Sequence, residues 1–306
     1  MERIKVFSPG SIGNVGSGFD VFGLAIEAIG DTIEVSKNTL GELRIKEIIG
    51  DSSISTNSEK NIVTVGVRAL LDYLNSEQGF DFKINKGVSG GSGMGSSGCS
   101  ATAGVFAVNE LINGGLTRKE LLPFAAVGEQ IASKEVHFDN IGPSMLGGLS
   151  VIRSIEPLEI LEIDVPDNLF LAMVKPGIVI KTDEAKKLIP ADLPLKTAIK
   201  QFGQISGLIT GMLKVDIDLI GRSLEDYVAT PYRSELIPKF NEAKVQALNS
   251  GAAGFNISGS GPAMFAICDG EAIAISVLTA LKKLYADDDK AKFYLTKPDT
   301  LGTRVI

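Results

Sequence analysis

One glycine-rich stretch decides the fold of this chain: Gly90-Gly91-Ser92-Gly93-Met94-Gly95-Ser96-Ser97-Gly98. It lies between a predicted strand at residues 80–84 and a predicted helix at 96–112. Glycines let a backbone approach an anion closely, and the unpaired N–H groups at a helix start attract that anion together with the helix dipole. Ser96 and Ser97 add hydroxyls for a phosphate oxygen or a magnesium ion. The stretch therefore predicts a polyphosphate-binding loop.

Other interpretations of this stretch fit less well. Gly93-x-Gly95-x-x-Gly98 matches the dinucleotide-binding fingerprint as a string, but that motif needs a strand ending in an acidic residue about 20 residues later. The pattern of residues 117–135 instead predicts a helix, which begins with a capping box formed by Thr117 and Glu120. No Gly-Lys-Ser/Thr follows, as a Walker loop requires. The stretch could also be a flexible loop that binds no ligand. So many glycines would then raise the entropic cost of folding without serving any purpose.

Two further glycine-rich stretches lie near the two ends of the chain. Asn14 and Asp20 in the first could bind a polar substrate, although taken alone such a segment is more typical of a turn. The second lies between two predicted strands and alone is more typical of a tight bend. The stretches are Ser8-Pro9-Gly10-Ser11-Ile12-Gly13-Asn14-Val15-Gly16-Ser17-Gly18-Phe19-Asp20 and Gly254-Phe255-Asn256-Ile257-Ser258-Gly259-Ser260-Gly261-Pro262.

Strands and helices alternate only loosely in both halves, which is typical of an α+β protein. Strands are predicted at 4–7, 33–37, 43–49, 80–84, 170–175, 255–258, 264–268 and 292–295. Helices are predicted at 61–74, 96–112, 117–135, 193–213, 236–248 and 273–285. A chain of 306 residues exceeds what one core usually serves, and the composition changes near residues 154–157. We therefore expect two domains, residues 1–155 with the phosphate loop and residues 156–306.

The composition excludes several classes of protein. At 44% hydrophobic and 22% charged it is globular, and a net charge of -7 without a long Lys/Arg run argues against nucleic-acid binding. No apolar run could cross a bilayer, and the opening residues show no signal-peptide pattern. Cys99 and Cys268 fit no metal-ligand spacing and are expected to be buried thiols. We expect a cytoplasmic protein without nucleic-acid or membrane partners, and the sequence leaves a homodimer open.

In their order and separation, the three glycine-rich stretches resemble the motifs of the GHMP kinase superfamily. The first matches its substrate motif, the middle one its phosphate loop, and the last its C-terminal Gly-x-Gly-Pro motif. The resemblance covers about residues 5–296. It implies a two-domain α+β fold, with an N-terminal domain like domain 2 of ribosomal protein S5 and a ferredoxin-like C-terminal domain. It also implies phosphoryl transfer from ATP to an alcohol.

Details of the motifs are most similar to the homoserine kinases of this superfamily. The similar segments are Asn14-Val15-Gly16-Ser17-Gly18-Phe19-Asp20, His137-Phe138-Asp139-Asn140-Ile141-Gly142-Pro143 and Arg233-Ser234-Glu235-Leu236-Ile237-Pro238. This likeness implies L-homoserine as the substrate and ATP with Mg2+ as cofactors. The implied product is O-phospho-L-homoserine, for threonine biosynthesis.

The same resemblance implies roles for single residues. Substrate contacts would come from Asn14, Asp20, His137, Lys186 and Arg233. ATP contacts would come from Asn61, Lys86, Gly90, Gly91, Ser92, Gly93, Met94, Gly95, Ser96 and Ser97. Ser97 and Glu129 match the positions that hold Mg2+, and with Asn140 they would form the catalytic set. The implied contacts are chemically sensible, because Arg233 offers a fork to a carboxylate and Asp20 suits an ammonium. His137, the only histidine, would alone be more typical of a structural residue.

Some positions depart from the superfamily pattern. Asn140 stands where several members have an aspartate base, and an amide cannot accept a proton, so positioning and charge neutralisation would carry the transfer. Asp139 is not expected to replace that base. Lys186 stands where arginine is common, which keeps the charge and loses the bidentate fork. Ser89 and Gly98-Cys99 replace a usual proline and two alanines at the phosphate loop.

Two alternatives keep the fold and change the function. A mevalonate-type or sugar kinase would have another acceptor, but Asp20 with His137 suits an ammonium better than a neutral diol. A catalytically silent binding protein would be expected to lose the loop glycines or Glu129, and both are present.

Overall fold

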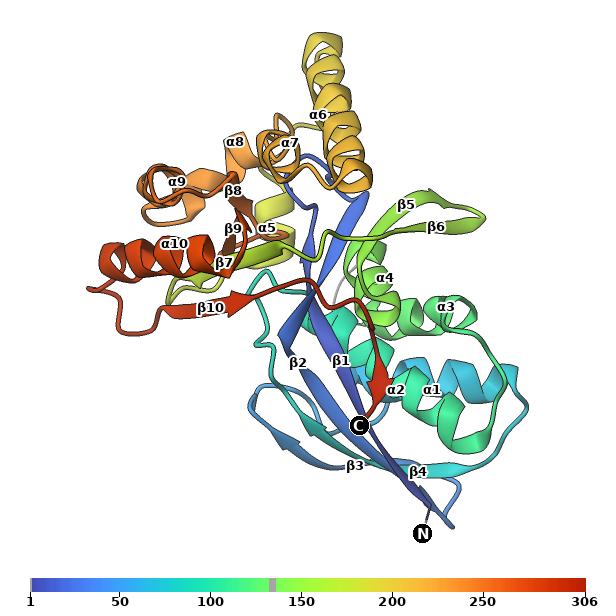
Figure 1. Ribbon diagram of the computed structural model, residues 1–306. Coiled ribbons are helices and arrows are strands. Elements are labelled where there is room, and N and C mark those ends of the chain that lie inside the picture. Colours follow the sequence, from blue (N-terminus) through green and yellow to red (C-terminus); the bar gives the residue numbers. More distant parts are fainter. Residues whose placement is uncertain (1, 132–135) are drawn as a thin grey trace.

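The structure, a computed structural model, describes residues 2–131 and 136–306. Within these residues the strands form a seven-stranded and a four-stranded sheet (Figure 1). The mixed α+β character predicted for both halves is confirmed. None of the described helices is long and apolar enough to cross a membrane.

The strands and helices have the following bounds. The strands are β1 (Arg3–Gly13), β2 (Phe22–Asn38), β3 (Leu43–Ile49), β4 (Gly79–Asn85), β5 (Leu149–Ile155), β6 (Leu158–Ile163), β7 (Leu169–Lys175), β8 (Gly254–Ile257), β9 (Met264–Asp269), β10 (Lys292–Thr296) and β11 (Arg304–Val305). The helices are α1 (Ile62–Tyr73), α2 (Ser96–Ile112), α3 (Arg118–Glu129), α4 (Phe138–Leu146), α5 (Thr182–Lys186), α6 (Leu195–Lys214), α7 (Ile217–Arg222), α8 (Thr230–Arg233), the 3-10 helix η1 (Ser234–Leu236), α9 (Phe240–Asn249) and α10 (Glu271–Leu284).

The larger sheet has the order β11-β1-β2-β4-β3, and β5 extends it from β2 with β6 beside β5. The β3–β4 pair is parallel, and α1 makes the crossover that such a pair requires. Helices α1 to α4 cover one face of this sheet (Figure 1). Phe80 and Phe82 of β4 and Leu70 and Leu71 of α1 are fully buried in the core between them.

The smaller sheet has the antiparallel order β10-β7-β9-β8, with α9 and α10 packed against it. Its own core includes Phe240, Phe255 and Leu281. A separate buried cluster joins the two sheets, with Ile12 and Phe22 from the first half packing among residues such as Phe265 from the second. The two halves therefore share a continuous apolar contact rather than a thin linker.

The expected domain boundary at residues 155 and 156 lies in the turn of the β5–β6 hairpin. Both strands of this hairpin belong to the larger sheet, which β11 also joins by pairing with β1. We propose a division near residue 164, which leaves the hairpin whole.

Local signals predicted several elements closely. Helix α2 has the predicted bounds because left-handed Gly95 and Asn113 flank it, and the capping box of Thr117 and Glu120 opens α3 as predicted. That helix was predicted to run to Glu135, which lies outside the described residues, but α3 already ends at Glu129 and Gln130 is its C-cap. Both cysteines are free and buried, as expected. The sequence did not indicate α4, because Gly142 and Pro143 lower its helix propensity.

Candidate active site

The glycine loop, residues 89–95, connects β4 to α2. Gly91, Gly93 and Gly95 have φ values of 62°, 80° and 66°, a region that other residues rarely adopt. Gly95 is the N-cap of α2, and its helix start receives no side-chain cap. The first N–H groups of a 17-residue helix are thus left for an external partner, which is the geometry of an anion site.

The glycine loop packs against the glycine-rich stretch of the second half. The Ser258 hydroxyl donates to the Gly93 carbonyl at 2.6 Å, and the Ala263 N–H donates to the Ser92 carbonyl at 3.1 Å. A Cβ atom on Gly93 would lie 2.5 Å from the carbonyl oxygen of Ser258, so only glycine fits there. Backbone from both halves therefore builds the floor of the site.

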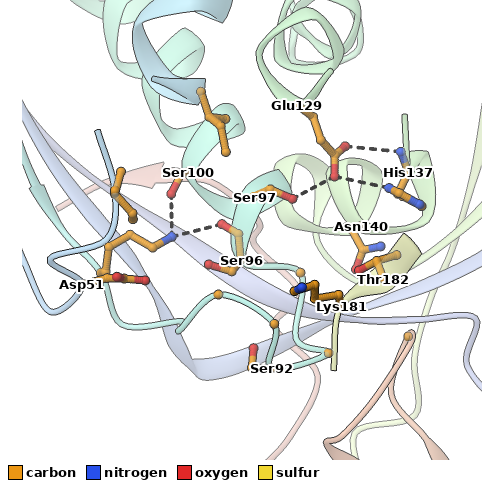
Figure 2. A pocket seen from close by; sticks show the side chains of 18 of the residues that line it. Asp51, Ser92, Ser96, Ser97, Ser100, Glu129, His137, Asn140, Lys181 and Thr182 are labelled. Atoms are coloured by element: carbon orange, nitrogen blue, oxygen red, sulfur yellow. Dashed lines mark hydrogen bonds and ion pairs between the residues drawn. The ribbon is translucent and has the colours of Figure 1, made fainter. Parts of the chain in front are cut away.

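A cavity of ≈ 490 Å³ lies over the glycine loop, within the size range of small-molecule sites. Its walls come from the end of β3 and the start of α1, from the first turn of α2, and from residues 179–183 and 259–260 of the second half. Figure 2 shows Asp51 on one side and Ser97, Glu129, His137 and Asn140 on the other.

One end of the cavity is lined by Asn61 and Asp51. Asn61 also caps α1, because its Oδ1 accepts from the Val63 N–H at 3.0 Å and its Nδ2 donates to the Ser55 carbonyl at 2.8 Å. One Nδ2 proton remains for a ligand. Hydrogen bonds from Ser53 hold the pKa of Asp51 below its usual value. Asp51 was not predicted, because a single aspartate after a strand carries no motif.

Lys86 is among the residues that line the cavity, but its side chain is buried and its ammonium is bonded to protein groups. It forms a buried ion pair with Asp31 and donates to the Ser100 hydroxyl at 2.6 Å and the Ser96 carbonyl at 3.1 Å. The place of Lys86 in ATP binding stays a prediction, and all three of its N–H bonds are directed at protein groups.

Glu129, only 1% exposed, brings two predicted residues together. Its carboxylate accepts from the Ser97 hydroxyl at 2.9 Å, and His137 Nδ1 lies 3.6 Å from the same oxygen, as Figure 2 shows. The interaction with Glu129 raises the pKa of His137. A buried carboxylate and a hydroxyl at the edge of an anion site are the oxygen donors that Mg2+ prefers.

Asn140 lies in the cavity wall next to the glycine loop. Its Oδ1 accepts from the Ser11 hydroxyl at 3.0 Å, and its Nδ2 donates to Asp139 at 3.2 Å. Asp139 is 3% exposed and accepts from the Asn14 N–H at 3.1 Å, so its carboxyl faces the backbone of the first glycine-rich stretch. It is not among the residues that line the cavity. Burial, followed by the charge of Asp20, raises the pKa of Asp139 to about 7.

The predicted substrate residues other than His137 gather beside this cavity, around the carbonyl of Gly259. Asn14 Nδ2 donates to that carbonyl at 3.0 Å and Arg233 Nη1 at 3.1 Å. The N–H of Asp20 donates to Asn14 Oδ1 at 3.0 Å, and the Asp20 carboxylate lies 3.6 Å from the ammonium of Lys186. We call Asn14, Asp20, Lys186 and Arg233 the Gly259 cluster.

Arg233 is buried and incompletely satisfied. It is 4% exposed, its Nε has no hydrogen-bond partner, and its guanidinium stacks on Phe19 at 5.3 Å. Burial lowers the pKa of Arg233 from its usual value. Because a buried cation with an unsatisfied N–H is costly, this geometry fits an arginine that receives an anionic ligand.

The cavity and the Gly259 cluster adjoin, because Gly259 lines the first and anchors the second. The φ values of 67° at Asn14 and 55° at Asp20 are unusual for non-glycine residues, as is common at ligand sites. A phosphate donor over the glycine loop and a small acceptor at the cluster would therefore meet near His137 and Asn140.

The sequence did not indicate some of the residues that line the cavity. One predicted residue, Met94, contributes only through its backbone. Thr182 and Ser260 line the cavity with their hydroxyls 3.3 Å apart, and Figure 2 shows Lys181 beside Thr182. Ser260 was within a quoted motif, whereas Thr182 and Lys181 gave no signal. The Met94 side chain is buried in the core, and its carbonyl accepts from the Ser11 N–H at 3.1 Å.

Family models match both halves of the chain. The model described as the N-terminal domain of GHMP kinases matches residues 61–148, and the model described as the GHMP kinase C terminal matches residues 208–287.

Curated relatives and solved structures agree with these matches. A homoserine kinase of Chloroherpeton thalassium is 38% identical over 93% of both chains, and one of Pyrococcus horikoshii is 40% identical over 96% of this chain and 97% of its own. A crystal structure of homoserine kinase from Cytophaga hutchinsonii is 37% identical with a TM-score of 0.97, covering 100% of this chain and 98% of that one. The L. major mevalonate kinase, 17% identical over 96% of both chains with a TM-score of 0.72, shares the fold.

Proposed function

This chain belongs to the homoserine kinases of the GHMP kinase family, and on that premise we propose how its residues phosphorylate L-homoserine. It is an ATP-dependent enzyme that transfers the γ-phosphoryl group to the side-chain hydroxyl, giving O-phospho-L-homoserine for threonine biosynthesis. The observation that carries the acceptor assignment is the buried, incompletely satisfied Arg233 within reach of the charge of Asp20. A cation and an anion side by side complement a zwitterionic amino acid.

ATP is placed in the cavity with its phosphates over the glycine loop. The N–H groups at the start of α2 would receive the β- and γ-phosphates, since they have no cap from any side chain. Asn61 has one amide proton free for the base. The apolar side chains of Ile62, Val63 and Ile84 in the same wall would cover its ring.

Ser97 and Glu129 are the residues that would hold Mg2+. Their oxygens are adjacent and Glu129 is buried, which suits a hard cation. Among the described residues no three His, Cys, Asp or Glu side chains form a metal cluster, so nucleotide phosphates would have to supply the remaining ligands. The ion would supply charge neutralisation on the phosphate oxygens.

Homoserine is placed in the Gly259 cluster. Arg233 would bind the α-carboxylate, with Lys186 adding a second positive charge from α5. Asp20 would bind the α-ammonium, and Asn14 can donate and accept beside it. His137 lines the cavity and interacts with the charges of both Glu129 and Asp20, so the side-chain hydroxyl would point toward the cavity.

In the transfer step the homoserine oxygen would form a bond to the γ-phosphorus as the bond between that phosphorus and the β,γ-bridging oxygen breaks and ADP leaves. Asn140 lies where the two ligands would meet and can donate an N–H to a phosphoryl oxygen, but it cannot accept the hydroxyl proton. The proton therefore leaves to the transferred phosphoryl group or to solvent, as a loose transition state allows.

Asp139→Asn is expected to keep kcat within about threefold, whereas loss of a general base costs about 10²- to 10⁴-fold. The carboxyl lies behind Asn140 and outside the cavity lining. Its pKa of about 7 exceeds the ordinary value near 4, so the folded protein holds an extra proton between about pH 4 and 7. Stability therefore falls as pH rises through that window, and the variant should lose this fall in a series of Tm measurements. A kcat loss above about 10²-fold with an unchanged Tm would identify Asp139 as the base.

The function itself is tested by offering L-homoserine, mevalonate and galactose in parallel to the purified protein with ATP and MgCl2. Coupled ADP release should occur with homoserine, and ³¹P NMR should show a phosphomonoester on its side chain. Turnover of mevalonate or galactose alone would assign another GHMP kinase activity. ATP binding without turnover of any acceptor would indicate a binding protein. We place the reaction in the cytoplasm, where the free buried cysteines fit a reducing environment.

A further inference from the structure

Asp31, in the middle of β2, is fully buried and accepts hydrogen bonds from the residues just before the glycine loop. Its Oδ1 accepts from the N–H groups of Gly87 at 3.0 Å and Val88 at 3.2 Å, the residues that lead from β4 into the loop. The backbone therefore leaves the sheet in a direction that this one carboxylate oxygen fixes.

The other oxygen of Asp31 accepts a hydrogen bond from a residue of α2, the helix that follows the same loop. Its Oδ2 accepts from the Ser100 hydroxyl at 2.5 Å and pairs with the ammonium of Lys86. That ammonium donates to Ser100 at 2.6 Å and to the Ser96 carbonyl at 3.1 Å, the dashed lines drawn at these two residues in Figure 2. Both Ser96 and Ser100 lie in the first turns of α2.

The ammonium of Lys86 has no donor left for a nucleotide. A lysine has three N–H bonds, and these are directed at Asp31, Ser96 and Ser100. Its side chain is 2% exposed and that of Asp31 is 0% exposed. The pair therefore acts on a bound anion only through the backbone that it holds.

We propose that Asp31 and Lys86 are positioning residues that clamp both ends of the glycine loop from behind and so set its affinity for ATP. This inference rests on the proposed binding of ATP at that loop. A ligand held by backbone N–H groups needs those groups fixed, because displacement by about 1 Å can cost about 10²-fold in rate. Asp31 also donates its N–H to Cys99 Sγ at 3.2 Å, which adds a further contact with the first turns of α2.

The test measures the dissociation constant of a non-hydrolysable ATP analogue by calorimetry, which does not depend on the acceptor. Asp31→Asn is the sharpest variant, because it frees the ammonium of Lys86 from its partner. We expect binding to weaken about 10- to 100-fold, the usual effect of losing a supporting partner. If Lys86 instead bound phosphate directly, its release would leave affinity unchanged or tighten it, and the proposal would be wrong.

A double variant separates positioning from stability. Asp31→Asn with Lys86→Met removes both buried charges, so Tm should return toward the wild-type value even if Lys86→Met alone does not fold. Affinity for the analogue should stay weakened, because the Ser96 carbonyl has lost its donor. Recovery of affinity together with Tm would contradict the proposal.

Asp299 supplies a matched control. It is buried, its Oδ1 accepts from the N–H groups of Leu301 at 2.9 Å and Gly302 at 2.8 Å, and it pairs with Arg304 at 2.8 Å away from the cavity. Asp299→Asn should lower Tm and leave analogue affinity unchanged, and an equal loss of affinity would overturn the special role of Asp31. A wild-type protein that binds the analogue but does not phosphorylate homoserine would refute the function and leave this inference testable.

Discussion

Replacing Glu129 with glutamine is expected to lower kcat/KM about 10³-fold, at the upper end of what loss of one charge-stabilising group costs. Glutamine keeps the shape and can still accept from the Ser97 hydroxyl at 2.9 Å, so the buried neighbourhood should survive. It removes the negative charge on which the proposed Mg2+ site depends. Because that charge also raises the pKa of His137, the pKa of this histidine should be lower in the variant than in the wild type.

The measurement is a steady-state rate at a series of MgCl2 concentrations, where the concentration for half-maximal activity should rise. Glu120→Gln is the matched control on the same helix, because Glu120 belongs to the exposed capping box at the other end of α3. It should change stability slightly and leave the rate as it is. A Glu129→Gln enzyme with wild-type rate and wild-type MgCl2 dependence would remove Glu129 from the metal site.

Arg233→Leu is expected to raise KM for homoserine about 10²- to 10³-fold, because each hydrogen bond to a charged group contributes about 1.5–3 kcal/mol. Burial and the unpartnered Nε of Arg233 are what make a bound carboxylate valuable at this position. KM for ATP should change little, since Arg233 is not among the residues that line the nucleotide cavity.

A truncated acceptor makes this prediction specific. 3-Aminopropan-1-ol is homoserine without its carboxylate, and the wild-type enzyme should use it about as poorly as the Arg233→Leu variant uses homoserine. The variant should no longer distinguish the two acceptors. Arg304→Leu is the control, because Arg304 also stacks on a phenylalanine, at 4.8 Å from the Phe7 ring, outside the site. Equal discrimination by wild type and Arg233→Leu would place the carboxylate elsewhere.

The sequence predicted the parts of the site that depend on neighbouring residues. The bounds of α2 and the start of the glycine loop follow from glycine conformations and helix capping, which are local. The resemblance also led to Ser97, Glu129 and His137, which do come together around one carboxylate. Their roles in binding remain predictions.

The sequence could not predict contacts that depend on strand pairing. The sequence indicated no partner for Lys86, whereas the pairing of Thr32 with Asn85 between β2 and β4 brings Asp31 next to it. These residues lie far apart along the chain and no motif joins them. The Asp20–Lys186 ion pair is similar, since it joins a loop of the first half to α5 of the second.

The bonds from Ser258 to Gly93 and from Ala263 to Ser92 have a consequence for how ligands enter and leave. A motion that separated the two halves here would have to break these hydrogen bonds beneath the loop at which we propose that the phosphates bind. A shared apolar cluster also joins the two halves, so separating the halves would expose Phe22 and Phe265 to water. We therefore expect nucleotide to enter and leave while the two halves stay packed against each other.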